Sequence, residues 1–141
     1  MATSRHADKI VWSNRLVTGS ANLDAEHREI VEWLGLVARS IEGEDESHGL
    51  FHASRYLRRF WDDHTEHERS MMLDRGYDPQ ATAAHLASHQ ELVVLLDSIQ
   101  TAHGLGERPA ATLHQIYVWL IDHIERHDAP FIAFIRSMNE R

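Results

Sequence analysis

The chain has 141 residues, 43% of them apolar and 12 of them histidine, and it carries a formal charge of −8 at pH 7. An acidic balance disfavours nucleic acids and anionic membranes as partners, because both attract basic surfaces. Since the chain lacks cysteine, it cannot form disulfides, and any metal must be held by nitrogen and oxygen ligands.

The length fits one domain, so we treat residues 1–141 as a single domain. The sequence contains no run of about 18 apolar residues, which a membrane span requires. It also lacks the apolar core of a secretory signal near its start. We therefore expect a cytoplasmic monomer without membrane insertion.

Residues 1–21 are expected to form an N-terminal arm, with Trp12 packed against the rest of the chain. A first helix is predicted near 22–42. A second helix is predicted near 49–75, after a polar stretch bounded by glycines. Gly76 suits the C-cap of this second helix, because glycine readily adopts a left-handed backbone.

Two more helices are predicted near 79–103 and 109–128. Each begins at a proline, which suits the first position of a helix, and Asp78 suits the N-cap of the third. Apolar residues recur in both at steps of three and four, and no segment shows the sustained alternation of a strand. Short connections make successive helices antiparallel, which predicts an all-α, up-down-up-down four-helix bundle.

Side chains that can bind metal recur at one end of this predicted bundle. At ~1.5 Å per residue, polar groups on all four helices fall within roughly 3–18 Å of the same end. At the end of the last helix, His127 and Asp128 compete for one position, and spacing alone does not choose between them. The other members of the set are His27, His64, Glu68, His85, His89 and His123.

A polar cluster satisfied by hydrogen bonds is the alternative to a metal site. So many imidazoles and carboxylates buried without metal would be costly to desolvate and sensitive to pH, which favours a dinuclear metal site. The remaining histidines are interpreted as surface residues, because they lie at the opposite end, off the polar face or outside the helices. They are His6, His48, His52, His67, His103 and His114.

Four motifs in order resemble the hemerythrin family, and within it the single-domain bacteriohemerythrins. Each motif alone is weak, but all four in this order are specific, and the resemblance extends from Trp12 to Asp128. The motifs are LDAEH, with His27; HTEHE, with His64 and Glu68; GYDPQATAAHLASH, with His85 and His89; and WLIDHIERHD, with His123 and Asp128.

The resemblance implies two iron ions (Fe²⁺/Fe³⁺) with an oxo or hydroxo bridge, which bind O2 reversibly for oxygen storage or delivery. It implies that His85, His89 and His123 bind one iron, that His27 and His64 bind the other, and that Glu68 and Asp128 bridge them. It thereby selects Asp128 over His127.

An O2 pocket is also expected from the resemblance. Four apolar residues lie one residue or one helical turn from the ligands, namely Ile30, Trp119, Leu120 and Ile124. The pocket is expected to include Thr65 as well, which stands where the family usually has phenylalanine.

Two other functions compete with an oxygen carrier. One is a module that senses oxygen or redox state and acts through a partner. The other is a di-iron peroxidase or an enzyme that handles nitric oxide. The site has few carboxylates and no Glu-x-x-His pair, which argues against an enzyme. Besides O2, the expected partners are an oxygen-consuming enzyme or a signalling protein.

Overall fold

The computed structural model describes residues 9–42, 47–99 and 109–139. Within these ranges the chain forms helices and no strand, which confirms the predicted all-α fold. A 3₁₀ turn in the arm, η2, precedes four long helices, the last of which continues through a π turn, η3, into a further helix. The elements are η2 (Asn14–Leu16), α1 (Ala21–Glu42), α2 (Ser47–Asp74), α3 (Pro79–Ile99), α4 (Pro109–His123), η3 (Ile124–Asp128) and α5 (Ala129–Asn139).

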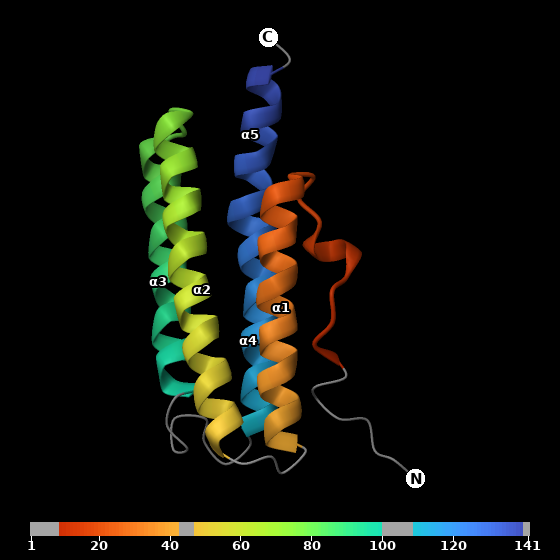
Figure 1. Ribbon diagram of the computed structural model, residues 1–141. Coiled ribbons are helices and arrows are strands. Elements are labelled where there is room, and N and C mark those ends of the chain that lie inside the picture. The colour runs from red at the N-terminus through yellow and green to blue at the C-terminus, as the bar shows by residue number, and fades with distance from the viewer. Residues whose placement is uncertain (1–8, 43–46, 100–108, 140–141) are drawn as a thin grey trace.

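Successive long helices run antiparallel, as Figure 1 shows. Helix α1 packs against α2 and α4, and α3 closes the ring against the same two helices. None of the described helices combines the length and apolar character that a bilayer crossing needs.

The turn between α2 and α3 has the predicted caps. Gly76 adopts φ +68°, and the Tyr77 N–H donates to the Met72 carbonyl at 3.0 Å, which closes the C-terminus of α2. The Asp78 carboxylate accepts a hydrogen bond from the Ala81 N–H at 2.8 Å, as an N-cap before Pro79 should. These caps fix where the third helix starts, and therefore at which depth its histidines lie.

The predicted end of the last helix near 128 is wrong. The chain remains helical through the π turn and α5 to Asn139. Pro130 suggested a stop, because proline lacks an N–H and disfavours a helix interior. Here Phe131 and Ile132, directly after it, are buried, and this burial outweighs the local preference. The predicted end of the third helix, at 103, lies outside the described residues.

The N-terminal arm runs along the outside of α1 (Figure 1). Its Ile10 and Leu16 side chains are buried in the main core. The Tyr117 hydroxyl on α4 donates to the Val11 carbonyl at 2.5 Å. Trp12 is half-buried, with the Arg28 guanidinium 5.0 Å from its ring centroid. The arm is thus fixed to the bundle at several points.

The interior contains two separate apolar cores. The larger extends from the arm through the bundle to Ile124 at the start of η3, and includes Ile30, Trp61 and Leu120. The smaller one lies at the opposite end, where α5 packs against α1 and α2. It consists of Leu23, Met72, Phe131 and Ile132, with partly buried neighbours. Along α1 and α2, the predicted metal ligands lie between these two cores.

Candidate metal centre

The structure brings all seven predicted ligand residues together. In one group of five and one group of three, which share Glu68, the candidate ligand atoms lie within 4.8 Å of one another. Every one of these residues is at most 2% exposed. The first group is Glu68, His85, His89, His123 and Asp128; the second is His27, His64 and Glu68.

Helix periodicity explains most of this convergence. His64 and Glu68 on α2 are four residues apart, as are His85 and His89 on α3, so each pair shares one helix face. His27 on α1 contributes a single ring, whose centroid lies 4.8 Å from that of His64.

The π turn explains the remaining pair, His123 and Asp128. In a regular α-helix, five residues leave two side chains about 140° apart around the axis. In a π turn, whose bonds run from i to i+5, residues five apart lie about one turn apart. The Ala129 N–H accordingly donates to the Ile124 carbonyl. Asp128 is therefore buried in the cluster, whereas His127 is only half-buried beside it.

Each carboxylate contacts histidines of both groups. Glu68 Oε1 lies 2.5 Å from His64 Nε2, and Glu68 Oε2 lies 2.7 Å from His85 Nε2. Asp128 Oδ2 lies 3.4 Å from His27 Nε2, and Asp128 Oδ1 lies 3.0 Å from His85 Nε2. Both acids therefore stand between the two sets of rings, where bridging ligands would stand.

These short distances are not matched by hydrogen bonds. Among the described residues, most of the cluster's buried side-chain atoms have no hydrogen-bond partner. They include Nε2 of His64, His85, His89 and His123, Oε2 of Glu68 and both oxygens of Asp128. Such orphaned buried groups are costly. Nitrogen and oxygen atoms that approach closely without hydrogen-bond alignment fit a shared cation, and the donor set suits iron, zinc or copper.

The side chains of the cluster differ in their pKa values. Although burial opposes it, the Glu68 carboxylate raises the pKa of His64 to about 10, and both acids raise the pKa of His85 to about 9. Burial lowers the pKa of His89 to about 4. Burial and the Glu68 charge raise the pKa of Asp128 to about 6. In the metal-free chain, protons on His64 and His85 therefore offset the negative charge of the carboxylates. Bound metal ions would take the place of these protons.

Two hydroxyl groups contact the outer nitrogens of the ligand rings. Thr65 Oγ1 lies 2.7 Å from His89 Nδ1, and Ser88 Oγ lies 2.7 Å from His123 Nδ1. The sequence interpretation did not identify Ser88, although its position directly before His89 was a usable signal. It also missed Trp61, whose ring stacks on His89 with centroids 4.5 Å apart.

Four of the five residues predicted to line an O2 pocket belong to the main core or pack against it. Ile30, Leu120 and Ile124 are buried in the main core. Trp119 is partly buried, and its ring stacks on His123 with centroids 5.0 Å apart. Their role as a pocket stays a prediction. Thr65 differs from them, because its hydroxyl is already bonded to protein atoms.

Three of the histidines interpreted as surface residues, or left open, have described side chains. His67 is exposed and bonded to Glu26 at 2.8 Å. His114 is half-buried and contacts the Tyr117 ring. His127 lies with its ring 5.2 Å from that of His123. The side chains of His6, His48, His52 and His103 lie outside the described residues.

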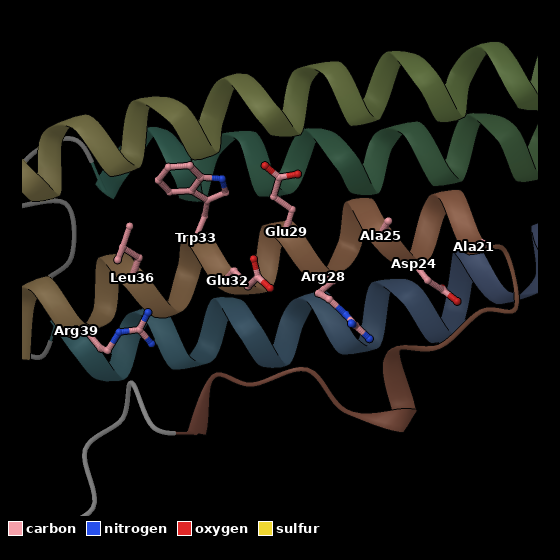
Figure 2. Close-up of a pocket in the computed structure, with 9 residues that line it drawn as sticks. All are labelled: Ala21, Asp24, Ala25, Arg28, Glu29, Glu32, Trp33, Leu36 and Arg39. Carbon is pink, nitrogen blue, oxygen red and sulfur yellow. The ribbon is translucent and has the colours of Figure 1, made fainter.

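An open groove follows the outer face of α1, and none of the seven cluster residues lines it. Figure 2 shows Glu29 and Trp33 directed toward α2, and Arg28 directed to the other side, toward α4 and the arm. The groove is therefore a separate surface feature.

Comparisons with known proteins agree with the geometry. Residues 18–135, which contain all seven cluster residues, match the family model described as the hemerythrin HHE cation binding domain. A bacteriohemerythrin of Pseudomonas paraeruginosa (strain DSM 24068 / PA7) is 27% identical over 133 residues, covering 93% of this chain and 85% of the relative. Bacteriohemerythrins of Pseudomonas aeruginosa strains LESB58 and UCBPP-PA14 are 26% identical over the same shares. No solved structure matches the chain significantly.

Proposed function

The chain belongs to the hemerythrin family, and we propose that it binds O2 reversibly at a centre of two non-haem iron ions, for oxygen storage or delivery. One observation carries the proposal. Five imidazole rings and two carboxylates converge in a space closed to solvent, and most of their inward-facing atoms have no hydrogen-bond partner in the described part of the chain. Imidazole nitrogen is a suitable ligand for iron, and a site with only two carboxylates differs from the carboxylate-rich ferritin-like di-iron sites.

We assign the ligands to two ions by their contacts. Glu68 directs Oε1 toward the group on α1 and α2, and Oε2 toward the group on α3. This supports Glu68 as a bridge, and Asp128, which contacts both groups, as the second bridge. The three-histidine group is His85, His89 and His123; the two-histidine group is His27 and His64, and it has fewer protein ligands.

When bound, two iron ions supply the electrons and the open coordination position that reversible O2 binding requires. The chain supplies the surroundings. Two carboxylates offset part of the charge of the ions, and the imidazoles can bind as neutral ligands. Ile30, Leu120 and Ile124, which we propose as pocket walls, are buried and apolar. Apolar walls exclude water, which suppresses side reactions of a reactive centre.

The test is an anaerobic reconstitution with Fe²⁺, followed by absorption spectra before air, after air and after oxygen is removed. We expect about two irons per chain, as in other dinuclear helical-bundle sites, and an absorption band that appears in air and disappears on deoxygenation. His67→Ala serves as the control variant, because His67 is exposed. It should keep full iron content, whereas His123→Ala should lose iron.

The outcomes separate the functions. A chain that takes up no iron would overturn the proposal entirely. A band that decays at once and irreversibly in air would retain the di-iron centre and exclude a carrier, in favour of redox sensing. Catalytic turnover with hydrogen peroxide or nitric oxide at the reconstituted centre would favour the enzyme instead.

A further inference from the structure

Thr65 makes two hydrogen bonds through one oxygen atom. Its Oγ1 lies 2.8 Å from the Trp61 carbonyl oxygen and 2.7 Å from His89 Nδ1. A carbonyl can only accept a hydrogen bond, so the single hydroxyl hydrogen is donated to Trp61. The oxygen must then accept from His89, which requires that His89 carry its proton on Nδ1.

This fixes the other nitrogen of the ring. A neutral imidazole has one N–H and one lone pair, so the lone pair of His89 lies on Nε2. That atom is buried, lies 3.3 Å from Glu68 Oε2, and has no hydrogen-bond partner among the described residues. Without Thr65, a proton on Nε2 beside that carboxylate would be the competing arrangement.

The ring is also held in place by Trp61. The two rings stack at an interplanar angle of 20°, and the Trp61 indole N–H donates to the His89 carbonyl at 3.1 Å. Trp61, Thr65 and His89 therefore restrain one another through stacking and three hydrogen bonds.

The other ligand rings lack this arrangement. Among the described residues, Nδ1 of His27, His64 and His85 has no hydrogen-bond partner. His123 Nδ1 is bonded to Ser88 Oγ, but no second bond fixes the direction of that hydroxyl hydrogen. Among the described residues, His89 is thus the ligand ring whose Nδ1 is bonded to a hydroxyl group with its hydrogen already committed elsewhere.

We propose that Thr65 is a positioning residue, which holds His89 with its proton on Nδ1 and its Nε2 lone pair directed into the cluster before metal arrives. The metal-binding consequence rests on the proposed di-iron centre. Because the hydroxyl hydrogen is donated to Trp61, it is not free to be donated to a molecule in the expected O2 pocket. Losing such a partner of a metal-binding histidine typically weakens metal binding by about 10- to 100-fold.

Two substitutions test the proposal. Thr65→Val removes the hydroxyl at nearly constant volume, whereas Thr65→Ser keeps it. Thr82→Val is the matched control, because Thr82 is a buried threonine with no side-chain hydrogen bond to a histidine among the described residues. Nitrogen NMR of the metal-free, ¹⁵N-histidine-labelled protein reports which ring nitrogen is protonated. Competition with a chromophoric chelator under anaerobic conditions reports the affinity for Fe²⁺.

In the wild type and Thr65→Ser, we expect His89 to be protonated on Nδ1. In Thr65→Val, we expect protonation to shift toward Nε2 and the Fe²⁺ affinity to fall about 10- to 100-fold, while Thr82→Val matches the wild type. His89 protonated on Nε2 in the wild type would overturn the proposal without any variant. So would an unchanged proton position in Thr65→Val. If the wild type binds no Fe²⁺, the proposed function fails, but the NMR result still decides the role of Thr65.

Discussion

Phe131 on α5 offers the sharpest test of how the end of the bundle is closed. Its side chain is fully buried, and its ring centroid lies 5.0 Å from that of Tyr77. It belongs to the smaller core, which separates the metal cluster from the end of the molecule. Phe131→Ala would remove this ring and leave a cavity between α5 and the turn after α2.

The expected loss of stability is about 3–5 kcal/mol, the usual cost of deleting a buried phenylalanine ring. The entropy of unfolding is about 2.1 cal/mol/K per residue, so a chain of 141 residues unfolds with about 0.3 kcal/mol/K. The melting temperature of the metal-free protein should therefore fall by roughly 10–17 °C. Urea denaturation followed by circular dichroism measures the free energy directly.

The control is Leu73→Ala, since Leu73 is also apolar but 59% exposed. This substitution should change stability by no more than about 0.5 kcal/mol. A loss below about 1 kcal/mol in Phe131→Ala, against 3–5 kcal/mol expected, would mean that α5 is not a folded part of the bundle in solution. The argument for helical continuation past residue 128 would then fail.

Three further predictions concern other parts of the molecule. Asp128→Asn should reduce the iron bound per chain well below the wild-type value, whereas His127→Ala should not. If a colorimetric iron assay finds equal losses in both variants, the assignment of Asp128 rather than His127 as the ligand is contradicted. Gly19 has φ +97°, so Gly19→Ala should destabilise by about 1–3 kcal/mol in urea titrations. Gly76→Ala, at φ +68° and with open space around it, should cost about 1–2 kcal/mol, because a left-handed backbone alone strains alanine. Tyr117→Phe removes a hydrogen bond to the arm and should cost about 0.5–1.5 kcal/mol, with faster proteolysis of the arm; an unchanged cleavage rate would show that this bond does not hold it.

The sequence predicted the bundle and the depth of the polar groups because both follow from regular geometry. Caps at Gly76 and Asp78 set the helix start, and a constant rise per residue then places His85 and His89. Spacing alone could not choose between His127 and Asp128, because the π turn departs from the 3.6-residue repeat on which such arguments depend.

The contacts of individual side chains were less predictable. Thr65 follows His64 directly, and sequence gives no information on which way its hydroxyl points. Its bond to the Trp61 carbonyl is a local option for threonine in a helix, but its bond to His89 depends on how α2 and α3 pack. Tertiary packing likewise kept α5 helical beyond Pro130.

The π turn sets the direction in which side chains point on either side of it in the last helix. Upstream of it, α4 presents His123 to the cluster; downstream, α5 presents Phe131 and Ile132 to the smaller core. If residues 124–128 formed a regular α-helix in place of the π turn, everything beyond them would rotate by about 100°. That change would move Asp128 off the cluster and turn both apolar side chains away from their core. The position of this ligand and the closure of the bundle are therefore both set by the same π turn.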